Sequence, residues 1–215
     1  SDAFVDKGEL MGLMTERLVE KYQLTKEQQD QIAAASHHNA VAAWDQGYFA
    51  DYVIPLEVRD RKKGKIVIEK DEGPRQITIE ELANQNPYFK PNGGTITAMN
   101  SSSINDGAAA LLLMTSAKAQ QLGLRPLGIL HSFTNIGVAR KFMGEGAFKV
   151  IDPLLRKGGM SMEQIDYFEL NEAFAAVVAA AYKFIPALAP DKTNQWGSGI
   201  ALGHPVGCTG ARQIT

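Results

Sequence analysis

The second half of this 215-residue chain alternates apolar runs with segments of helical spacing, and this alternation limits the possible fold more than any other feature. Residues 108–114 form a continuous apolar run, Ala-Ala-Ala-Leu-Leu-Leu-Met, of the kind found in strands buried on both faces. Further strands are predicted at 127–133 and 165–170, and helices at 116–121, 147–157 and 173–184. The pattern predicts a layered α/β domain in which helices cover a sheet.

The first half is expected to be helical and then irregular. Apolar side chains at helical spacing between residues 11 and 22 predict one helix with a buried face. Thr25 with Gln28 forms a capping box that opens a longer helix. Short strands at Val53-Ile54-Pro55 and 66–68 flank a basic run, which we interpret as a solvated hairpin tip. Thr78 can cap a short helix, and the composition changes near residue 100, which indicates a domain boundary there.

Composition and charge exclude several classes of protein. Hydrophobic residues make up 45% of the chain and charged residues 21%, as in soluble globular proteins. The net charge of −2 argues against nucleic-acid binding by the whole chain, and no apolar run is long enough to span a membrane. The single cysteine, Cys208, excludes an internal disulfide framework and is typical of a reducing compartment. We therefore expect a cytoplasmic protein with no nucleic-acid partner, no membrane partner and no metal site.

Small and hydroxyl-bearing residues cluster in the first of three segments that could carry chemistry. Residues 94–107 read Gly-Thr-Ile-Thr-Ala-Met-Asn-Ser-Ser-Ser-Ile-Asn-Asp-Gly. Such a segment can be a tight turn rich in hydrogen bonds between side chains and backbone. It can equally be a loop whose Ala98 and Ser102 line a ligand channel, and the residues alone leave both interpretations open.

The second segment, Leu-Asn-Glu-Ala-Phe-Ala at 170–175, joins the end of a predicted strand to the start of a helix. Ligands bind at this place in open α/β sheets. Asn171 can cap the helix, or it can hold a water or polarise a carbonyl. Glu172 can act as an acid or base, or can simply favour the helix dipole, and Phe174 by itself is expected to pack in the core.

The third segment, residues 198–212, places His204 in a glycine-rich turn before a segment that can form a helix. A histidine in that setting can titrate near neutral pH and exchange protons with a substrate, although an ordinary surface turn is the alternative. The other histidines have no such setting and are interpreted as structural or surface residues. Cys208 is close in sequence, but cysteine–histidine pairs meet through the fold, so we expect a small buried thiol there.

Together the three segments resemble the thiolase family of acetyl-CoA acyltransferases. Asn-Glu-Ala-Phe-Ala at 171–175 resembles the family's asparagine motif, and Gly-His-Pro-Val-Gly at 203–207 resembles its histidine motif. Residues 105–110 resemble the signature that enters the last core domain, and Asp2-Ala3-Phe4 with Met11-Gly12 resembles the start of the loop domain. The resemblance implies a mostly helical loop domain that binds coenzyme A, residues 1–102, followed by an incomplete thiolase-like layered α-β-α core domain, residues 103–215.

The resemblance also implies roles for individual residues. His204 would activate a nucleophilic cysteine and stabilise the thioester oxygen, and Asn171 would hold a water that completes a second oxyanion hole. Arg75 would lie near the nucleotide end of coenzyme A, which is a substrate rather than a tightly bound cofactor. The pantetheine tunnel would be lined by Met11, Phe89, Ala98, Ser102, Ala173 and Phe174.

The chain departs from the family pattern mainly in its cysteines. The family's nucleophile lies upstream of the loop domain and its acid/base cysteine lies after the helix that follows His204, so this chain contains no nucleophilic cysteine. We therefore expect a fragment that lacks the N-terminal core domain and the extreme C-terminus, and that is inactive alone. Leu10 and Trp196-Gly197-Ser198 replace residues common in the family, which leaves substrate preference open.

The parent protein is expected to transfer an acyl group between a 3-ketoacyl-CoA or acetyl-CoA and coenzyme A, as a homodimer or homotetramer. Two alternatives remain at this point. One is a non-catalytic module that binds coenzyme A. The other is a different condensing enzyme of the same superfamily, such as a ketoacyl synthase. Asn-Glu-Ala-Phe argues against the latter, because those enzymes usually need a second histidine at that place.

Overall fold

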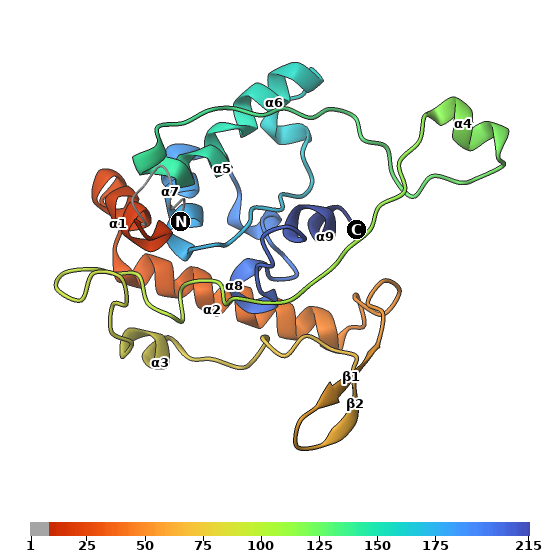
Figure 1. Cartoon of the computed structure of the whole chain (residues 1–215). Coiled ribbons are helices and arrows are strands. Elements are labelled where there is room, and N and C mark those ends of the chain that lie inside the picture. The colour runs from red at the N-terminus through yellow and green to blue at the C-terminus, as the bar shows by residue number, and fades with distance from the viewer. Residues whose placement is uncertain (1–8) are drawn as a thin grey trace.

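The computed structural model describes residues 9–215, so the proposed loop-domain start at residues 2–4 lies outside the described residues. Most of the regular structure is helical (Figure 1). The α-helices are α1 (Met11–Tyr22), α2 (Lys26–Asp45), α3 (Ile79–Ala83), α4 (Ser116–Gln121), α5 (Gly146–Lys149), α6 (Ile151–Gly158), α7 (Ala175–Phe184), α8 (Gly199–Leu202) and α9 (Thr209–Ile214). Short 3-10 helices are η1 (Arg140–Glu145), η2 (Met162–Gln164) and η3 (Pro190–Lys192), and the strands are β1 (Leu56–Asp60) and β2 (Gly64–Ile68).

Local capping signals set where several helices begin. Thr25 accepts a hydrogen bond from the Gln28 amide at 3.1 Å, and the Gln28 side chain accepts one from the Thr25 amide at 3.0 Å, so the capping box of α2 is confirmed. Thr78 and Glu81 form the same reciprocal pair at the start of α3. Each box satisfies backbone N–H groups that the first turn of a helix leaves without a partner.

The predicted basic hairpin is present, but its first strand begins later than expected. β1 pairs antiparallel with β2, in a register that runs from Leu56 opposite Ile68 to Asp60 opposite Gly64. The Asp60 carboxylate accepts hydrogen bonds from two backbone amides of the tip, whose basic side chains are exposed. The expected strand at Val53-Ile54-Pro55 is wrong, because proline has no N–H group to donate to a ladder and pairing begins only after it.

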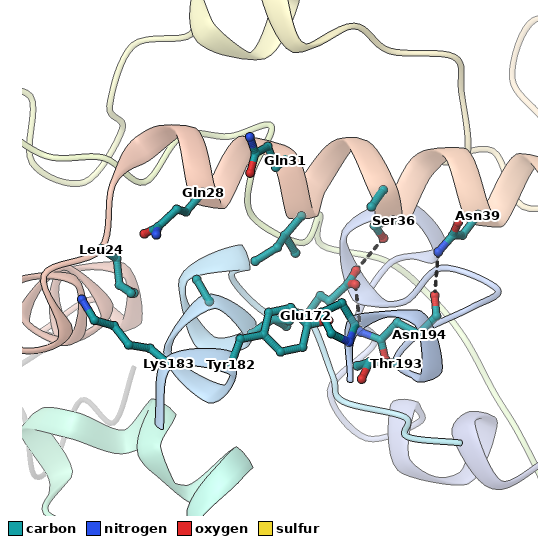
Figure 2. A pocket seen from close by; sticks show the side chains of 15 residues that line it. Leu24, Gln28, Gln31, Ser36, Asn39, Glu172, Tyr182, Lys183, Thr193 and Asn194 are labelled. Atoms are coloured by element: carbon teal, nitrogen blue, oxygen red, sulfur yellow. Dashed lines mark hydrogen bonds between the residues drawn. The ribbon is translucent and has the colours of Figure 1, made fainter. Parts of the chain in front are cut away.

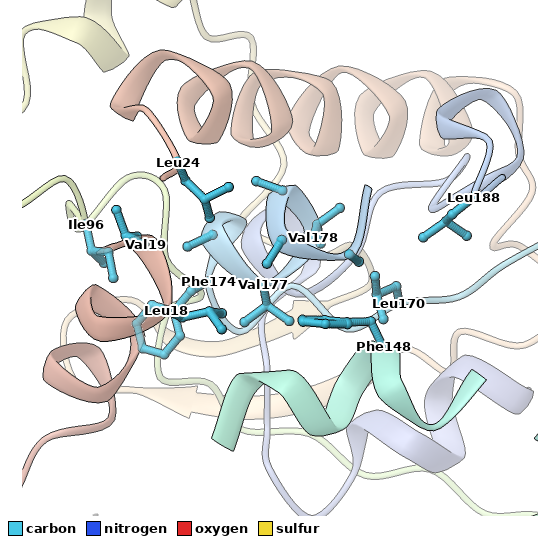
Figure 3. Packing of buried hydrophobic residues seen from close by; sticks show 14 residues of the cluster. Leu18, Val19, Leu24, Ile96, Phe148, Leu170, Phe174, Val177, Val178 and Leu188 are labelled. Atoms are coloured by element: carbon cyan, nitrogen blue, oxygen red, sulfur yellow. The ribbon is translucent and has the colours of Figure 1, made fainter. Parts of the chain in front are cut away.

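The hydrophobic core forms around α7, which is buried along most of its length. α1 and α2 pack against α7, and α5 packs on it as well. Figure 3 shows Leu18 of α1, Phe148 of α5 and Val177 of α7 pointing toward one another. Alanines occupy many of the remaining positions of α7, and their small side chains let the neighbouring helices approach its backbone closely. α2 also packs against α8, and this contact brings the first half of the chain to the turn that carries His204.

The apolar runs predicted as buried strands do not form a sheet within the described residues. Residues 108–114 and 127–133 are extended but pair with no neighbouring strand there, and Leu112 is 83% exposed. Figure 1 shows the segment that carries α4 extending away from the rest of the chain. Residues 165–170 make only a single bridge, between Phe168 and Thr193. A strand in a sheet needs hydrogen-bonding neighbours, and its apolar faces need other elements to cover them. The apolar pattern indicates a need for burial, but the described residues supply no partner strands for these segments.

Helices were predicted more accurately. α4 ends before Gly123 as expected, and the helix predicted at 147–157 is present in two pieces, α5 and α6. α6 ends at Gly158, and the next residue, Gly159, has the left-handed φ of +67° expected just after a helix C-terminus. Among the described residues, no helix combines the length and apolar character that crossing a membrane requires.

Candidate active site

The side chains of Asn171 and His204 meet, although they lie 33 positions apart in the sequence. The amide nitrogen Nδ2 of Asn171 is 3.3 Å from Nδ1 of His204 and 3.4 Å from its Nε2. Asn171 precedes α7 and His204 follows α8, so two separate turns position the pair. Both residues are partly buried, which leaves them accessible while removing much of their contact with water.

Thr209 contacts the ring of His204. Nδ1 of His204 lies 2.7 Å from Oγ1 of Thr209, whose hydroxyl can donate to the carbonyl of Pro205 at 3.1 Å. In the tautomer where Thr209 donates to Pro205 and accepts from Nδ1 of His204, Nε2 is the unprotonated ring nitrogen. Burial, and then the positive charge of Arg212, lower the pKa of His204 below its usual value. A neutral imidazole with an unprotonated Nε2 is suited to accept a proton.

Two glycines allow the close packing of these turns. Gly203 has a φ of +85°, and a Cβ on it would lie 2.4 Å from the side chain of Asn105. A Cβ on Gly199 would lie 2.7 Å from Oδ1 of Asn171. The first glycine brings the hydroxyl-rich segment beside the histidine turn, and the second lets α8 pack directly on Asn171.

Two aromatic rings, here called the aromatic wall, and a hydrogen-bonded loop adjoin the residues that follow Asn171. The rings of Phe89 and Phe174 meet edge to face, with centroids 5.9 Å apart. Phe89 also lies over Gly12 of α1, where a Cβ would come within 2.3 Å of the ring. The amide of Ser102 donates to the carbonyl of Ala173 at 3.0 Å. The hydroxyl-rich segment is therefore joined to the residues that follow Asn171.

Buried polar contacts hold the hydroxyl-rich segment in place from α1 and α2. The carboxylate of Glu16 accepts hydrogen bonds from the amides of Thr95 and Ile96, both at 2.9 Å. The fully buried side chain of Asn100 accepts from the Thr97 amide at 2.8 Å and donates to Asp30 of α2 at 3.0 Å. These contacts make the segment a fixed loop beside the site, and the loop also has the turn-like hydrogen bonding that the sequence suggests.

The structure brings together most of the residues predicted to line a tunnel, but not all of them. Phe89, Ser102, Ala173 and Phe174 lie in the contacts just described, and Met11 precedes Gly12 in the first turn of α1. Ala98 lies in the same fixed loop and is exposed. Arg75 is exposed too; its charge acts on His37 of α2, whose pKa is lowered to about 4 by burial first and by Arg75 second.

One interpretation of the asparagine segment is wrong. Asn171 does not cap α7, because the residue at the N-cap position is Phe174 and no side chain accepts a hydrogen bond there. The carboxylate of Glu172 is bound by residues outside α7. Glu172 is 2% exposed, and its carboxylate accepts hydrogen bonds from Ser36 at 2.5 Å, from Asn194 at 2.9 Å and from the Ile200 amide at 3.4 Å. Burial raises the pKa of Glu172 to about 7.

Asn194 connects Glu172 to the end of the preceding segment. Its side-chain amide donates to Glu172 and to the Leu170 carbonyl, and its Oδ1 accepts from the Leu170 amide, the last two at 2.8 Å. Asn194 has a left-handed φ of +51°. Figure 2 shows Ser36, Glu172 and Asn194 at one end of a cavity of about 570 Å³ between α2 and α7. Asn171 and His204 do not line this cavity.

Sequence reasoning missed Thr209, Gly199, Ser36 and Asn194. Of these, only Thr209 could have been found from the sequence. It lies five positions after His204 at the predicted start of a helix, where a hydroxyl can reach back to the histidine ring. The expected state of Cys208 is confirmed, since it is a buried free thiol. Among the described residues, no group of three or more metal-ligating side chains comes together.

Comparison with known proteins decides the family. The model of the thiolase N-terminal domain matches residues 2–117, and that of the thiolase C-terminal domain matches residues 124–215. The chain belongs to the thiolase family. A probable acetyl-CoA acyltransferase of Staphylococcus epidermidis is 45% identical over 95% of this chain, which covers 52% of that protein. The chain therefore spans about half the length of the curated relatives it matches.

Solved thiolase structures confirm the expected fold class. The acetyl-CoA acetyltransferase of Bacillus anthracis superposes with a TM-score of 0.90 at 44% identity, over 95% of this chain and 52% of that one. The dimeric peroxisomal thiolase of Saccharomyces cerevisiae gives a TM-score of 0.90 at 37% identity, over 96% and 51%. The exposed apolar segments are thus part of an incomplete thiolase-like α/β fold.

Proposed function

We propose that this thiolase chain contributes the histidine and asparagine of a site that transfers an acyl group between a 3-ketoacyl-CoA or acetyl-CoA and coenzyme A. The contact between Asn171 and His204, beside the aromatic wall of Phe89 and Phe174, carries the proposal. The names of the relatives, acetyl-CoA acyltransferase and acetyl-CoA acetyltransferase, support the same chemistry.

In the proposed reaction, Nε2 of His204 takes the proton of a cysteine thiol. With a 3-ketoacyl-CoA, the thiolate adds to the 3-keto carbon and the bond between C2 and C3 then breaks, leaving an acyl-cysteine and the enolate of acetyl-CoA. The enolate carbon takes up the proton held by His204. The thiol of a second coenzyme A then displaces the cysteine from the acyl group, and its proton returns to the cysteine sulfur. The amide of Asn171 holds a water that donates to the carbonyl oxygen as its negative charge develops. This chain supplies no such thiol, because Cys208 is buried and packs toward Gly107.

The proposal assigns coenzyme A binding to residues 1–102 and the catalytic pair to residues 103–215. The pantetheine arm passes the wall formed by Phe89 and Phe174, and Met11, Ala98, Ser102 and Ala173 complete its channel. Arg75 is an exposed cation that can meet the phosphates of the nucleotide end. For the whole protein we propose a cytoplasmic location and a homodimer or homotetramer; the yeast relative is described as dimeric.

Thiolysis of acetoacetyl-CoA tests the proposal. The purified chain is assayed alone, and then mixed with a polypeptide that carries the half of the Bacillus anthracis relative that this chain does not match. We expect no turnover by either part alone and measurable turnover by the mixture, abolished by His204→Ala. His38→Ala is the matched control, because His38 is exposed on α2. Turnover by this chain alone, or turnover by the mixture that survives His204→Ala, would contradict the proposal.

A further inference from the structure

Helix α8 holds the turn that carries His204, yet it lacks a cap of its own. It has four residues, Gly199–Leu202, and Ser198 at its N-cap position makes no side-chain cap hydrogen bond. The first amides of a helix have no partner within that helix and are costly to leave unpaired when buried. Ser198, Ile200 and Ala201 are all buried, so their amides need acceptors from elsewhere in the chain.

Ser36 and Glu172 supply those acceptors from two other elements. Oγ of Ser36, on α2, accepts from the amides of Ser198 and Ala201, both at 3.3 Å. The Glu172 carboxylate accepts from the Ile200 amide at 3.4 Å. The Ser36 hydroxyl itself donates to Glu172 at 2.5 Å, so the two side chains act as one unit (Figure 2). A carboxylate at this end of α8 is also favoured by the partial positive charge of a helix N-terminus.

The same unit connects directly to both members of the catalytic pair. Glu172 is the neighbour of Asn171 in the chain, so fixing its carboxylate fixes the turn that presents the Asn171 amide. At the other end, α8 is followed by Gly203 and His204, so the position of α8 sets the position of the imidazole. Ser36 is 1% exposed and Glu172 is 2% exposed, which leaves neither free to move into water.

We propose that Ser36 and Glu172 are positioning residues that cap α8 from α2 and thereby set the distance between Asn171 and His204. The catalytic meaning of that distance rests on the proposed function. The geometry does not depend on that function: α2 holds the turn that carries His204 through the hydroxyl of Ser36 and the carboxylate of Glu172. Neither side chain contacts His204, and both act through the backbone of α8.

Native-state hydrogen exchange and an NMR titration of His204 test this in the 215-residue chain. Ser36→Ala removes the hydroxyl oxygen, and Glu172→Gln keeps the size of the side chain but replaces one of its two acceptor oxygens with an NH2 group that can only donate. Losing a buried acceptor is expected to speed exchange at the Ile200 and Ala201 amides by about ten- to a hundredfold. We expect the pKa of His204 to rise toward its usual value in both variants, because a loosened turn exposes the ring to water.

Thr25→Ala is the matched control, because it weakens α2 by removing the cap at its far end. It should leave the pKa of His204 and the relative exchange of Ile200 and Ala201 unchanged. The inference is overturned if Ser36→Ala and Glu172→Gln speed exchange at these amides no more than elsewhere. An equal effect of Thr25→Ala on His204 would also overturn it. Neither readout uses acyl transfer, so this test and the test of the proposed function fail independently.

Discussion

Replacing Glu145 with glutamine measures how much the buried carboxylate between α1 and η1 contributes to the free energy of unfolding. Glu145 is 3% exposed and accepts hydrogen bonds from Lys21 at 2.5 Å, Lys149 at 2.6 Å and Tyr22 at 2.9 Å. Burial by itself would raise the pKa of Glu145. The hydrogen bonds from Lys149, Lys21 and Tyr22 outweigh that effect and lower the pKa to about 2.

The magnitude follows from the two pKa values. A folded value of about 2 against the ordinary 4.5 corresponds to about 3 kcal/mol of stabilisation at neutral pH. The side chains of Lys21 and Lys149 are 40% and 32% exposed, so water screens part of the interaction. We therefore expect Glu145→Gln to lower the free energy of unfolding by about 2 kcal/mol at pH 7.

The effect must also depend on pH in a defined direction. Because the folded pKa is lower than the unfolded one, the stabilisation is fully present above pH 4.5 and is lost as the pH falls toward 2. Urea unfolding followed by circular dichroism at pH 7 and pH 3 measures it. The difference between the original chain and Glu145→Gln should shrink to roughly half or less at pH 3.

The exposed pair Asp152–Arg156 provides the control for this experiment. Both side chains are 69% exposed, so Asp152→Asn should change the free energy of unfolding by less than about 0.5 kcal/mol at either pH. The reasoning is refuted if Glu145→Gln costs the same at pH 7 and pH 3. It is also refuted if Asp152→Asn is as destabilising as Glu145→Gln.

Three further predictions address the site and the exposed surface. Gly12→Ala should displace the ring of Phe89 and lower the free energy of unfolding by about 1–3 kcal/mol, because the new Cβ would lie 2.3 Å from that ring. Urea unfolding measures the change, and an unchanged unfolding midpoint would contradict the prediction. Arg212→Met should raise the pKa of His204 in an NMR titration without restoring its usual value, because burial, the larger cause, remains; an unchanged or lower pKa would count against the assigned cause. The chain should self-associate and bind an apolar dye through the exposed apolar residues of the segment 108–133, and Leu112→Asp should weaken both effects. Sedimentation of the original chain as a monomer, together with no dye binding, would contradict this prediction.

Helices were predictable where their signals were local. The capping boxes at Thr25 and Thr78 and the glycine at 159 each depend on neighbours within a few residues, so the sequence contains everything these helix ends need. The strands predicted at 108–114 and 127–133 depend on partners distant in sequence. An apolar run indicates a segment that needs burial, but it does not identify the strand or helix that would bury it.

The candidate site was predictable as a pair of motifs but not as a geometry. The resemblance pointed to Asn171 and His204, and the structure brings their side chains together. The capping of α8 by Ser36 and Glu172 could not be predicted, because its hydrogen bonds join residues that are between 28 and 165 positions apart. A serine within a long helix carries no local sign that its hydroxyl will meet a buried carboxylate.

The backbone geometry at Asn194 restricts which sequences this fold can tolerate. A φ of +51° favours glycine, asparagine or aspartate. Glycine would leave Leu170 and Glu172 without their hydrogen-bond partners, and aspartate would set a second carboxylate against Glu172. Position 194 therefore favours asparagine while Glu172 is present. In a library of variants, residues 172 and 194 should change together, and asparagine at 194 should be less strictly required where the carboxylate at 172 has been replaced.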